Sequence, residues 1–286
     1  MGAPMARHLV ERGFTVHGFD VRPAALANLE SAGGLVAGSP AALASAVQVV
    51  ITSLPSSAAL DSVINDDDGL IAGASPGLTV VETSTLSIAA KEQGYAELAR
   101  SGITMLDCPL SGTASQMETR DVAVYASGDR DALARQQEVL AAFSRAQYNV
   151  GRFGNGTKLK LIANHLVTIH NVAAAEALLL AERAGLDLEF ALAALTDGAG
   201  SSRMLEVRGP MMVAKDFSRP NMRLDGYVKD IDLIGSFGRD LECPLPLFAA
   251  CAQLYFAALA QGRHAEDPAV VHAVLATLVN PDVSQR

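Results

Sequence analysis

The spacing of the hydrophobic residues changes once along the chain, near Gly154, and this change constrains the fold more than any other feature. Before Gly154, apolar runs of strand length alternate with helical patterns, which predicts an α/β domain with a mostly parallel sheet. After Gly154 the pattern is helical throughout, and one long helix runs to Ala184, where Gly185 ends it. We therefore expect an α/β domain over residues 1–152, an all-helical domain over residues 153–286, and a long helix that joins them.

The first twenty residues resemble the second half of a dinucleotide-binding unit. An amphipathic helix pattern leads into an apolar run, Phe14 to Phe19, that ends in Asp20. In the full unit a strand and Gly-x-Gly-x-x-Gly come first, and the acidic residue binds the ribose hydroxyls. Gly2 fits the third glycine, whereas the first strand and the first two glycines are missing. We expect the coding sequence to continue upstream of Met1 with that strand; the alternative is a truncated chain that binds cofactor poorly.

Two residues at this strand end favour different cofactors. The carboxylate of Asp20 accepts hydrogen bonds from ribose hydroxyls and repels a 2′-phosphate, which favours NAD. Arg22 could instead meet the 2′-phosphate of NADP. The sequence leaves NAD and NADP open and favours NAD slightly.

The later strand patterns end in polar or turn residues. These strands are expected at Val47–Ser53, Leu78–Val81, Ile103–Leu106, Val122–Ala126 and Gln147–Val150. Leu54-Pro55 follows the first of them, Glu82 to Thr85 the second, and Asp107 to Thr113 the third. Since ligands of open α/β sheets bind at the carboxyl ends of the strands, these loops are candidate ligand loops. A hydroxyl beside glycine, as in Ser111-Gly112, can offer O–H and N–H donors to an anion, although an ordinary turn has the same composition.

Lys160 and Asn164 lie four residues apart in the long helix, so their side chains share one helix face. A lysine and an amide at a domain junction suggest a proton-transfer and orienting pair, and the alternative is a solvated lysine beside an exposed asparagine. Lys158 points to another side of the helix.

A second lysine of interest opens a later helix. The pattern predicts a helix over Val228–Arg239, with Lys229-Asp230 in its first turn. A lysine there opposes the helix dipole, which suggests that a ligand holds it in place.

The charge and the apolar runs exclude several classes of partner. The net charge of −9 argues against nucleic acid and anionic membrane surfaces. The most apolar run, Leu247–Ala260, is too short to span a membrane. No signal-peptide pattern is found, so we expect a cytoplasmic protein.

No metal site is assigned. The three cysteines, Cys108, Cys243 and Cys251, form no Cys-x-x-Cys pair and are expected to be buried thiols in a reducing compartment. The acidic run Asn65–Gly69 lacks the closing glutamate of a calcium loop, and the histidines are scattered.

Six motifs, in this order and at this spacing, resemble the β-hydroxyacid dehydrogenase family, which includes 3-hydroxyisobutyrate dehydrogenase and tartronate semialdehyde reductase. The matching segments are Met1–Ala6, Leu54–Pro55, Glu82–Thr85, Asp107–Thr113, Gly154–Asn164 and Lys229–Asp230. The family pattern Gly-x-Gly-x-x-x-Lys-x-x-x-Asn is intact in the fifth. The resemblance covers the whole chain, which lacks only the first strand and the first two glycines of the family pattern. It implies a Rossmann-like, doubly wound sheet followed by a helical domain.

The resemblance also implies hydride transfer between NAD(P) and a small β-hydroxy acid or its semialdehyde. Lys160 would be the base in oxidation and the acid in reduction, and Asn164 would orient the reacting oxygen or the substrate carboxylate. Because the ordinary pKa of lysine is about 10, burial in a closed cleft must favour its neutral form. The implied substrate-binding residues are Ser111, Gly112, Thr113 and Lys229. The implied cofactor-binding residues are Met1, Gly2, Asp20, Arg22, Leu54, Pro55, Thr85 and Lys229. Helical second domains in this family commonly pair, so a homodimer or homotetramer is expected.

The departures from the family pattern fall in the substrate loop. Thr113 replaces a glycine that can use a positive φ, and Met117 to Val122 stands where the family has Ala-x-x-Gly-Thr-Leu. The identity of the acid therefore stays open. Imine reductases share the architecture but usually lack the lysine, so an imine or other carbonyl reductase is a second hypothesis. A non-catalytic dinucleotide-binding protein is a third, because the glycine turn is missing.

Overall fold

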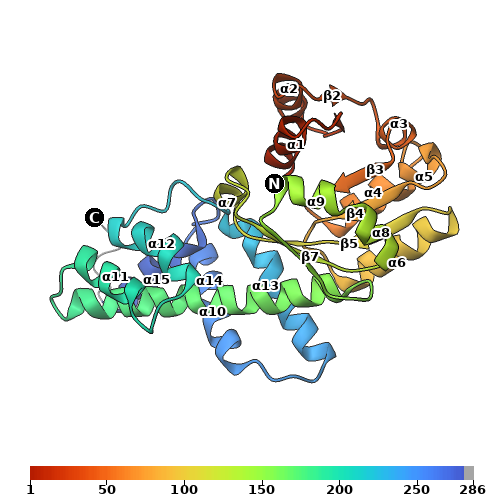
Figure 1. Cartoon of the computed structure of the whole chain (residues 1–286). Coiled ribbons are helices and arrows are strands. Elements are labelled where there is room, and N and C mark those ends of the chain that lie inside the picture. Colours follow the sequence, from red (N-terminus) through yellow and green to blue (C-terminus); the bar gives the residue numbers. More distant parts are fainter. Residues whose placement is uncertain (280–286) are drawn as a thin grey trace. The chain divides into compact units, whose positions relative to one another are not determined.

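The computed structural model describes residues 1–279, which divide into two compact units between Lys160 and Leu161. The division falls within the long helix α10 (Asn155–Arg183), whose first residues pack in the first unit (Figure 1). The domain boundary predicted between residues 152 and 153 precedes this helix and remains a prediction.

The first unit has the predicted Rossmann-like fold. Three parallel strands, β3 (Val49–Thr52), β4 (Thr79–Glu82) and β5 (Thr104–Asp107), lie side by side in the order β3-β4-β5 (Figure 1). Every residue of β4 is buried, as expected for a strand inside a parallel sheet. α3 (Pro40–Ala46) precedes β3, and the helices between these strands are α4 (Ser57–Asn65), α5 (Leu70–Gly73) and α6 (Ile88–Arg100).

A second sheet of the same unit contains β6 (Leu110–Ser111), β7 (Ala123–Ala126) and β8 (Ala146–Asn149). β7 and β8 are parallel, whereas β6, which the sequence did not predict, is antiparallel to β7. The helices here are α7 (Ala114–Glu118), α8 (Arg130–Arg135) and α9 (Gln137–Phe143). α8 and α9 follow one another between β7 and β8 and meet at Gln136.

The N-terminal elements are α1 (Gly2–Glu11), β1 (His17–Gly18), α2 (Pro23–Ser31) and β2 (Leu35–Val36). β1 is shorter than the predicted strand and pairs in parallel with β2. Among the described strands, β1 and β2 form a separate two-stranded sheet, and β3 is an edge strand of the sheet β3-β4-β5. The expected upstream strand remains a prediction.

The second unit is helical throughout its described residues, as predicted. After α10 come α11 (Leu188–Asp197), α12 (Arg203–Ala214), α13 (Leu224–Asp240), α14 (Pro246–Ala260), the 3₁₀ turn η1 (Pro268–Val270) and α15 (Val271–Val279). α14 covers the most apolar run of the sequence, and Phe248, Cys251 and Tyr255 form its buried face. Over residues 1–279, none of the helices combines the length and the apolar character that crossing a membrane requires.

The predicted start of α13 is wrong. The helix begins at Leu224 rather than Val228, so Lys229 lies in its second turn and does not oppose the dipole in the first. Its start is fixed by backbone hydrogen bonds from Leu224 to the carbonyl of Glu266 and from Asp225 to that of His264. Because these partners lie far away in the sequence, the local pattern could not show where the helix begins.

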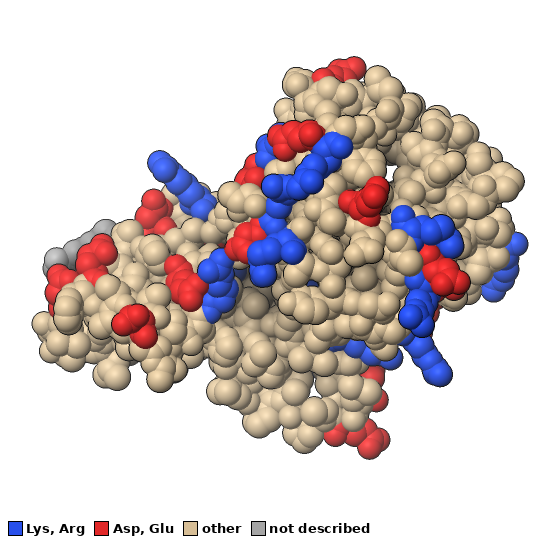
Figure 2. Space-filling view, in the orientation of Figure 1, with Lys and Arg blue, Asp and Glu red and all other residues tan. Residues whose placement is uncertain are grey.

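The expectation for the cysteines is wrong in one case. All three thiols are free, and Cys108 and Cys251 are buried, but Cys243 is exposed. On the face drawn in Figure 2, acidic and basic side chains lie next to one another, so the negative net charge is not gathered into one patch there.

Candidate active site

The helix α10 begins directly against the strand ends of the first unit. Gly154 precedes it with φ +87°, a conformation that favours glycine. A Cβ on Gly156 would lie 2.4 Å from the carbonyl oxygen of Tyr125 and 2.7 Å from that of Asp107. The second glycine of the motif is therefore required because the helix backbone packs on the backbone of the strands.

Lys160 follows one turn after Gly156 and is 8% exposed. Lys158 on the same helix is exposed. Of the two lysines at the start of α10, only Lys160 is thus shielded from solvent. The alternative interpretation, in which Lys160 is a solvated lysine, does not fit this burial. A buried amine in this position can exchange a proton with a bound group.

Asn164 and Lys229 share a partner, Asp230. The amide nitrogen of Asn164 donates a 2.9 Å hydrogen bond to Oδ2 of Asp230, and Nζ of Lys229 lies 3.2 Å from Oδ1 of the same carboxylate. Asn164 and Asp230 are buried, whereas Lys229 is partly exposed. The structure therefore brings these two predicted residues together. Sequence reasoning did not include Asp230 among the site residues, although its place beside Lys229 in the motif was a signal.

A buried hydroxyl pair supports α10 at the same turn. The hydroxyl of Thr168 donates to the carbonyl of Asn164 at 2.9 Å and lies 2.7 Å from the hydroxyl of Tyr227. Burial raises the pKa of Tyr227 to about 12, so this hydroxyl stays protonated to higher pH than an ordinary tyrosine and can act as a donor.

The substrate loop differs from its expected geometry. The positive φ falls on Gly112 (φ +151°), where a Cβ would lie 2.6 Å from Cγ1 of Val122, and Thr113 has an extended φ of −95°. Thr113 therefore does not use the left-handed conformation that a glycine allows, and it caps α7. Its hydroxyl accepts from the N–H of Gln116, and its own N–H donates to the Gln116 side chain at 3.0 Å. This N–H can hold a substrate carboxylate only after Gln116 releases it, whereas Ser111 lies on β6, before this cap.

Arg120 occupies a left-handed position with φ +59°, where the resembled family has glycine. Such a conformation costs a residue with a Cβ about 1 kcal/mol or more. We expect Arg120→Gly to raise the free energy of unfolding by about 1 kcal/mol, measured by urea denaturation. Thr119→Gly, at a φ of −104° in the preceding residue, is the matched control and should lower that free energy. An equal change in both variants would contradict strain at Arg120.

Asp20 and Arg22, interpreted from sequence as opposing cofactor signals, are paired with each other. The Arg22 side chain donates two 3.1 Å hydrogen bonds to the Asp20 carboxylate, and its backbone N–H donates a third at 2.9 Å. The hydrogen bond from the Arg22 guanidinium lowers the pKa of Asp20 below its usual value. Asp20 is therefore an ionised acceptor, and two of the five side-chain N–H donors of Arg22 are committed to it.

The other predicted cofactor residues lie at a helix start and in the loops after β3 and β4. Met1 caps α1 without a side-chain hydrogen bond, and Gly2 is exposed, with only Cβ of Ser53 as near as 4.0 Å to an added Cβ. Phosphate binding at this helix start remains a prediction. Leu54 and Pro55 follow β3, and the N–H of Leu54 donates to the hydroxyl of Ser84 at 2.7 Å. Thr85 follows β4 in the same way.

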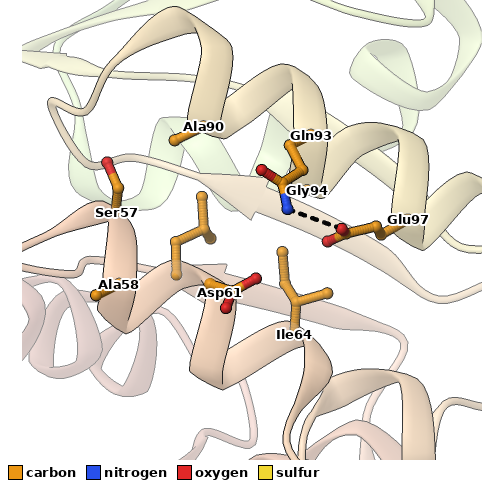
Figure 3. A pocket seen from close by; sticks show the side chains of 9 residues that line it. Ser57, Ala58, Asp61, Ile64, Ala90, Gln93, Gly94 and Glu97 are labelled. Carbon is orange, nitrogen blue, oxygen red and sulfur yellow. Dashed lines mark hydrogen bonds between the residues drawn. The ribbon is translucent and has the colours of Figure 1, made fainter.

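Two other features of the first unit carry none of the predicted chemistry. A groove between α4 and α6 is lined by apolar residues such as Ile64 and by the polar side chains of Ser57, Asp61, Gln93 and Glu97, and no predicted site residue lies in it (Figure 3). Burial raises the pKa of the Cys108 thiol to about 12, so it is no nucleophile at neutral pH.

Comparisons with known proteins match almost the whole chain. Residues 1–152 match a family model described as the NAD-binding domain of 6-phosphogluconate dehydrogenase. Residues 154–275 match one described as the NAD-binding region of NADP-dependent 3-hydroxyisobutyrate dehydrogenase.

Individual relatives agree with these models. The chain is 34% identical to an L-threonate dehydrogenase of Cupriavidus necator, over 95% of this chain and 91% of that protein. It is 28% identical to a 3-sulfolactaldehyde reductase of Escherichia coli, over 93% of this chain and 90% of that protein. A crystal structure of 3-hydroxyisobutyrate dehydrogenase from Salmonella typhimurium has a TM-score of 0.86 and 32% identity, covering 96% of this chain and 95% of that one.

Proposed function

This chain belongs to the β-hydroxyacid dehydrogenase family of NAD(P)-dependent oxidoreductases that act on CH–OH groups, and from that membership we propose that it transfers a hydride between NAD(P) and a small β-hydroxy acid or its semialdehyde. The observation that carries the proposal is the burial of Lys160 in an intact Gly-x-Gly-x-x-x-Lys-x-x-x-Asn motif. An amine in this motif that is only 8% exposed has no role as a solvated charge.

Lys160 is the proposed general acid and base. When the cofactor is bound, its nicotinamide ring exchanges a hydride with the carbon that bears the hydroxyl. In oxidation Lys160 takes the hydroxyl proton, and in reduction it returns a proton to the carbonyl oxygen. A lysine accepts a proton only as the neutral amine, a form that surroundings of low dielectric favour.

The neighbouring polar groups orient the substrate in this proposal. The Asp230 carboxylate holds the Asn164 side chain, which leaves the amide oxygen of Asn164 to accept from the substrate hydroxyl. Lys229 complements the negative charge of the acid, and Ser111 with Gly112 donates to its carboxylate. Thr113 joins them when its N–H is released from Gln116.

The substrate proposed first is a small acid with hydroxyl groups beside the carboxylate. The relatives at 30% identity or more over nearly the full chain include L-threonate dehydrogenases, and a more distant one is a 3-sulfolactaldehyde reductase. Both names describe a small anion with a hydroxyl-bearing or aldehyde carbon. L-threonate and 3-hydroxyisobutyrate are therefore the first members of the test panel.

The proposal is tested by a panel of hydroxy acids, semialdehydes and cyclic imines with NAD and NADP, followed by nicotinamide absorbance. Oxidation of one of the acids supports the proposal. Reduction of imines alone would assign the chain to the imine reductases, and NADH binding without turnover would assign it a non-catalytic role.

NAD is the proposed cofactor, through Asp20. In Asp20→Ser the ribose acceptor is lost and Arg22 is freed from its carboxylate partner. We expect the ratio of kcat/KM for NADP to that for NAD to rise at least about ten-fold, equivalent to about 1.4 kcal/mol. Steady-state kinetics with both cofactors measures the ratio. Glu30→Gln, which removes an exposed carboxylate on α2, should leave it unchanged. A ratio that stays constant in Asp20→Ser would rule out Asp20 as the determinant.

We also propose a homodimer or homotetramer that uses the second unit. Three large apolar side chains at the end of α10 and in the segment after it are exposed: Leu180 (71%), Leu186 (58%) and Phe190 (74%). Large apolar side chains left in water favour a protein contact that would cover them. Light scattering of the purified protein gives the subunit number.

A further inference from the structure

The first unit buries three charged side chains that the proposed mechanism does not use. Glu82 ends β4, Asp107 ends β5, and Lys91 lies on α6, and the exposed fraction of each is 0%. Nζ of Lys91 lies 2.8 Å from Oδ1 of Asp107 and 3.7 Å from Oε1 of Glu82. Buried charges are unfavourable unless they are paired and hydrogen-bonded, so each member of this cluster depends on the others.

The Asp107 carboxylate holds the first turn of α10. Its Oδ2 accepts the backbone N–H of Thr157 at 2.8 Å, and its Oδ1 accepts the hydroxyl of Thr157 at 2.7 Å. The hydroxyl of Ser127 donates to Oδ2 at 3.1 Å and itself accepts the N–H of Gly156 at 2.9 Å. The N–H groups at a helix start have no partner within the helix, and here two of them are satisfied by side chains from the sheet. A carboxylate at this end is also favoured by the helix dipole.

The position of Lys160 follows from this attachment. Lys160 lies three residues after Thr157, close to one helical turn further along, so its Cα moves and rotates with the first turn. Gly156 lets the same turn pack directly on the strands, because the carbonyls of Tyr125 and Asp107 leave no room for a Cβ there. An error of about 1 Å in the placement of a catalytic group can cost about a hundred-fold in rate.

The other side of the cluster reaches the loops proposed for the cofactor. Glu82 accepts the N–H of Ser84 at 2.6 Å and the hydroxyl of Thr52. The hydroxyl of Ser84 accepts the N–H of Leu54. A single ammonium group, that of Lys91, thus lies between the carboxylate that supports these loops and the carboxylate that holds α10.

We propose that Asp107 and Lys91 are positioning residues for hydride transfer, in which their buried ion pair anchors the first turn of α10 and thereby places Lys160. The inference rests on the proposed role of Lys160. Asp107 acts through Thr157 and Lys91 acts through Asp107, so neither side chain need touch the substrate.

The test uses Thr157, because its side chain can be changed without a change in charge or much change in size. Thr157→Val removes the hydroxyl that donates to Asp107 and keeps the backbone N–H, whereas Thr157→Ser keeps the hydroxyl. We expect kcat to fall about ten-fold in Thr157→Val, with KM for the acid changed less than about two-fold, and to stay within about two-fold of the wild type in Thr157→Ser. Asp107→Asn should lower kcat further, by about a hundred-fold, since the amide cannot accept all four donors.

Two controls separate positioning from loss of stability. Ile64→Val shortens a side chain on α4 that is completely buried in the same unit, and it should lower stability without lowering kcat. Amide hydrogen exchange at Gly156 and Thr157 should be faster in Asp107→Asn, with unchanged exchange in β3. The exchange readout needs no turnover, so it tests the anchor even if the proposed function fails. Wild-type kcat in Thr157→Val, an equal loss of kcat in Ile64→Val, or unchanged exchange at the helix start would each overturn the proposal.

Discussion

Replacing Lys160 with methionine is expected to lower kcat by about three orders of magnitude, within the range that general acid–base groups contribute. Methionine preserves most of the volume of the buried side chain and removes the only proton-transfer group proposed on this helix face. The dissociation constant of NADH, measured by fluorescence titration, should change less than about two-fold, because the proposed cofactor residues lie elsewhere. The combination of lost turnover with retained cofactor binding is what a proton-transfer role requires.

Lys158→Met is the matched control. Lys158 lies two residues earlier on the same helix, carries the same charge and is exposed. Its replacement should leave kcat within about two-fold of the wild type. Near-normal turnover in Lys160→Met, or an equal loss in both variants, would falsify the assignment of Lys160.

The elements that sequence predicted well are those whose residues carry their own signal. The strands β3 and β4 are short apolar runs, and parallel strands buried on both faces have this composition. The helix α3 begins where Ser39 accepts the N–H of Ala42 and Pro40 occupies the first helical position, a Ser-Pro pair typical of helix starts. Ends differ by one or two residues, since strand ends depend on the partner strand.

The elements that sequence missed are set by distant partners. β6 is only Leu110–Ser111 and exists through its pairing with β7, which lies beyond α7. α13 starts at Leu224 because the segment before η1 accepts its first N–H groups. A two-residue strand has no period to detect, and neither of these hydrogen-bonding partners is local.

The candidate site divides in the same way. The shared face of Lys160 and Asn164 follows from helix geometry alone, and the structure places both on α10 with little exposure. The pairing of Asp20 with Arg22 could not be predicted, since each residue by itself has another plausible partner in a cofactor. The attachment of Thr157 to Asp107 spans 50 residues of sequence and is visible only in three dimensions.

Gly156→Ala is the second change expected to have a large effect. In an ordinary helix alanine is more favourable than glycine by about 1 kcal/mol. Here the added Cβ would lie 2.4 Å from the Tyr125 carbonyl oxygen and 2.7 Å from that of Asp107, and both neighbours are backbone atoms that cannot turn aside. The helix start must move away from the strands. We expect a loss of about 1–3 kcal/mol in the free energy of unfolding, measured by urea denaturation, and a fall in kcat of about a hundred-fold.

Gly226→Ala is its control, because Gly226 lies in α13 with no atom within 4 Å of an added Cβ. This variant should be as stable as the wild type or slightly more stable, as expected for a helical glycine with open space around it. If Gly156→Ala behaved in the same way, the helix would not pack on the strand carbonyls as described. The loss of turnover should also exceed the loss of NADH binding, because a displaced first turn moves Lys160 while Asp20 and Gly2 stay in place. A variant that lost both in equal measure would indicate unfolding of the first unit rather than misplacement of the amine.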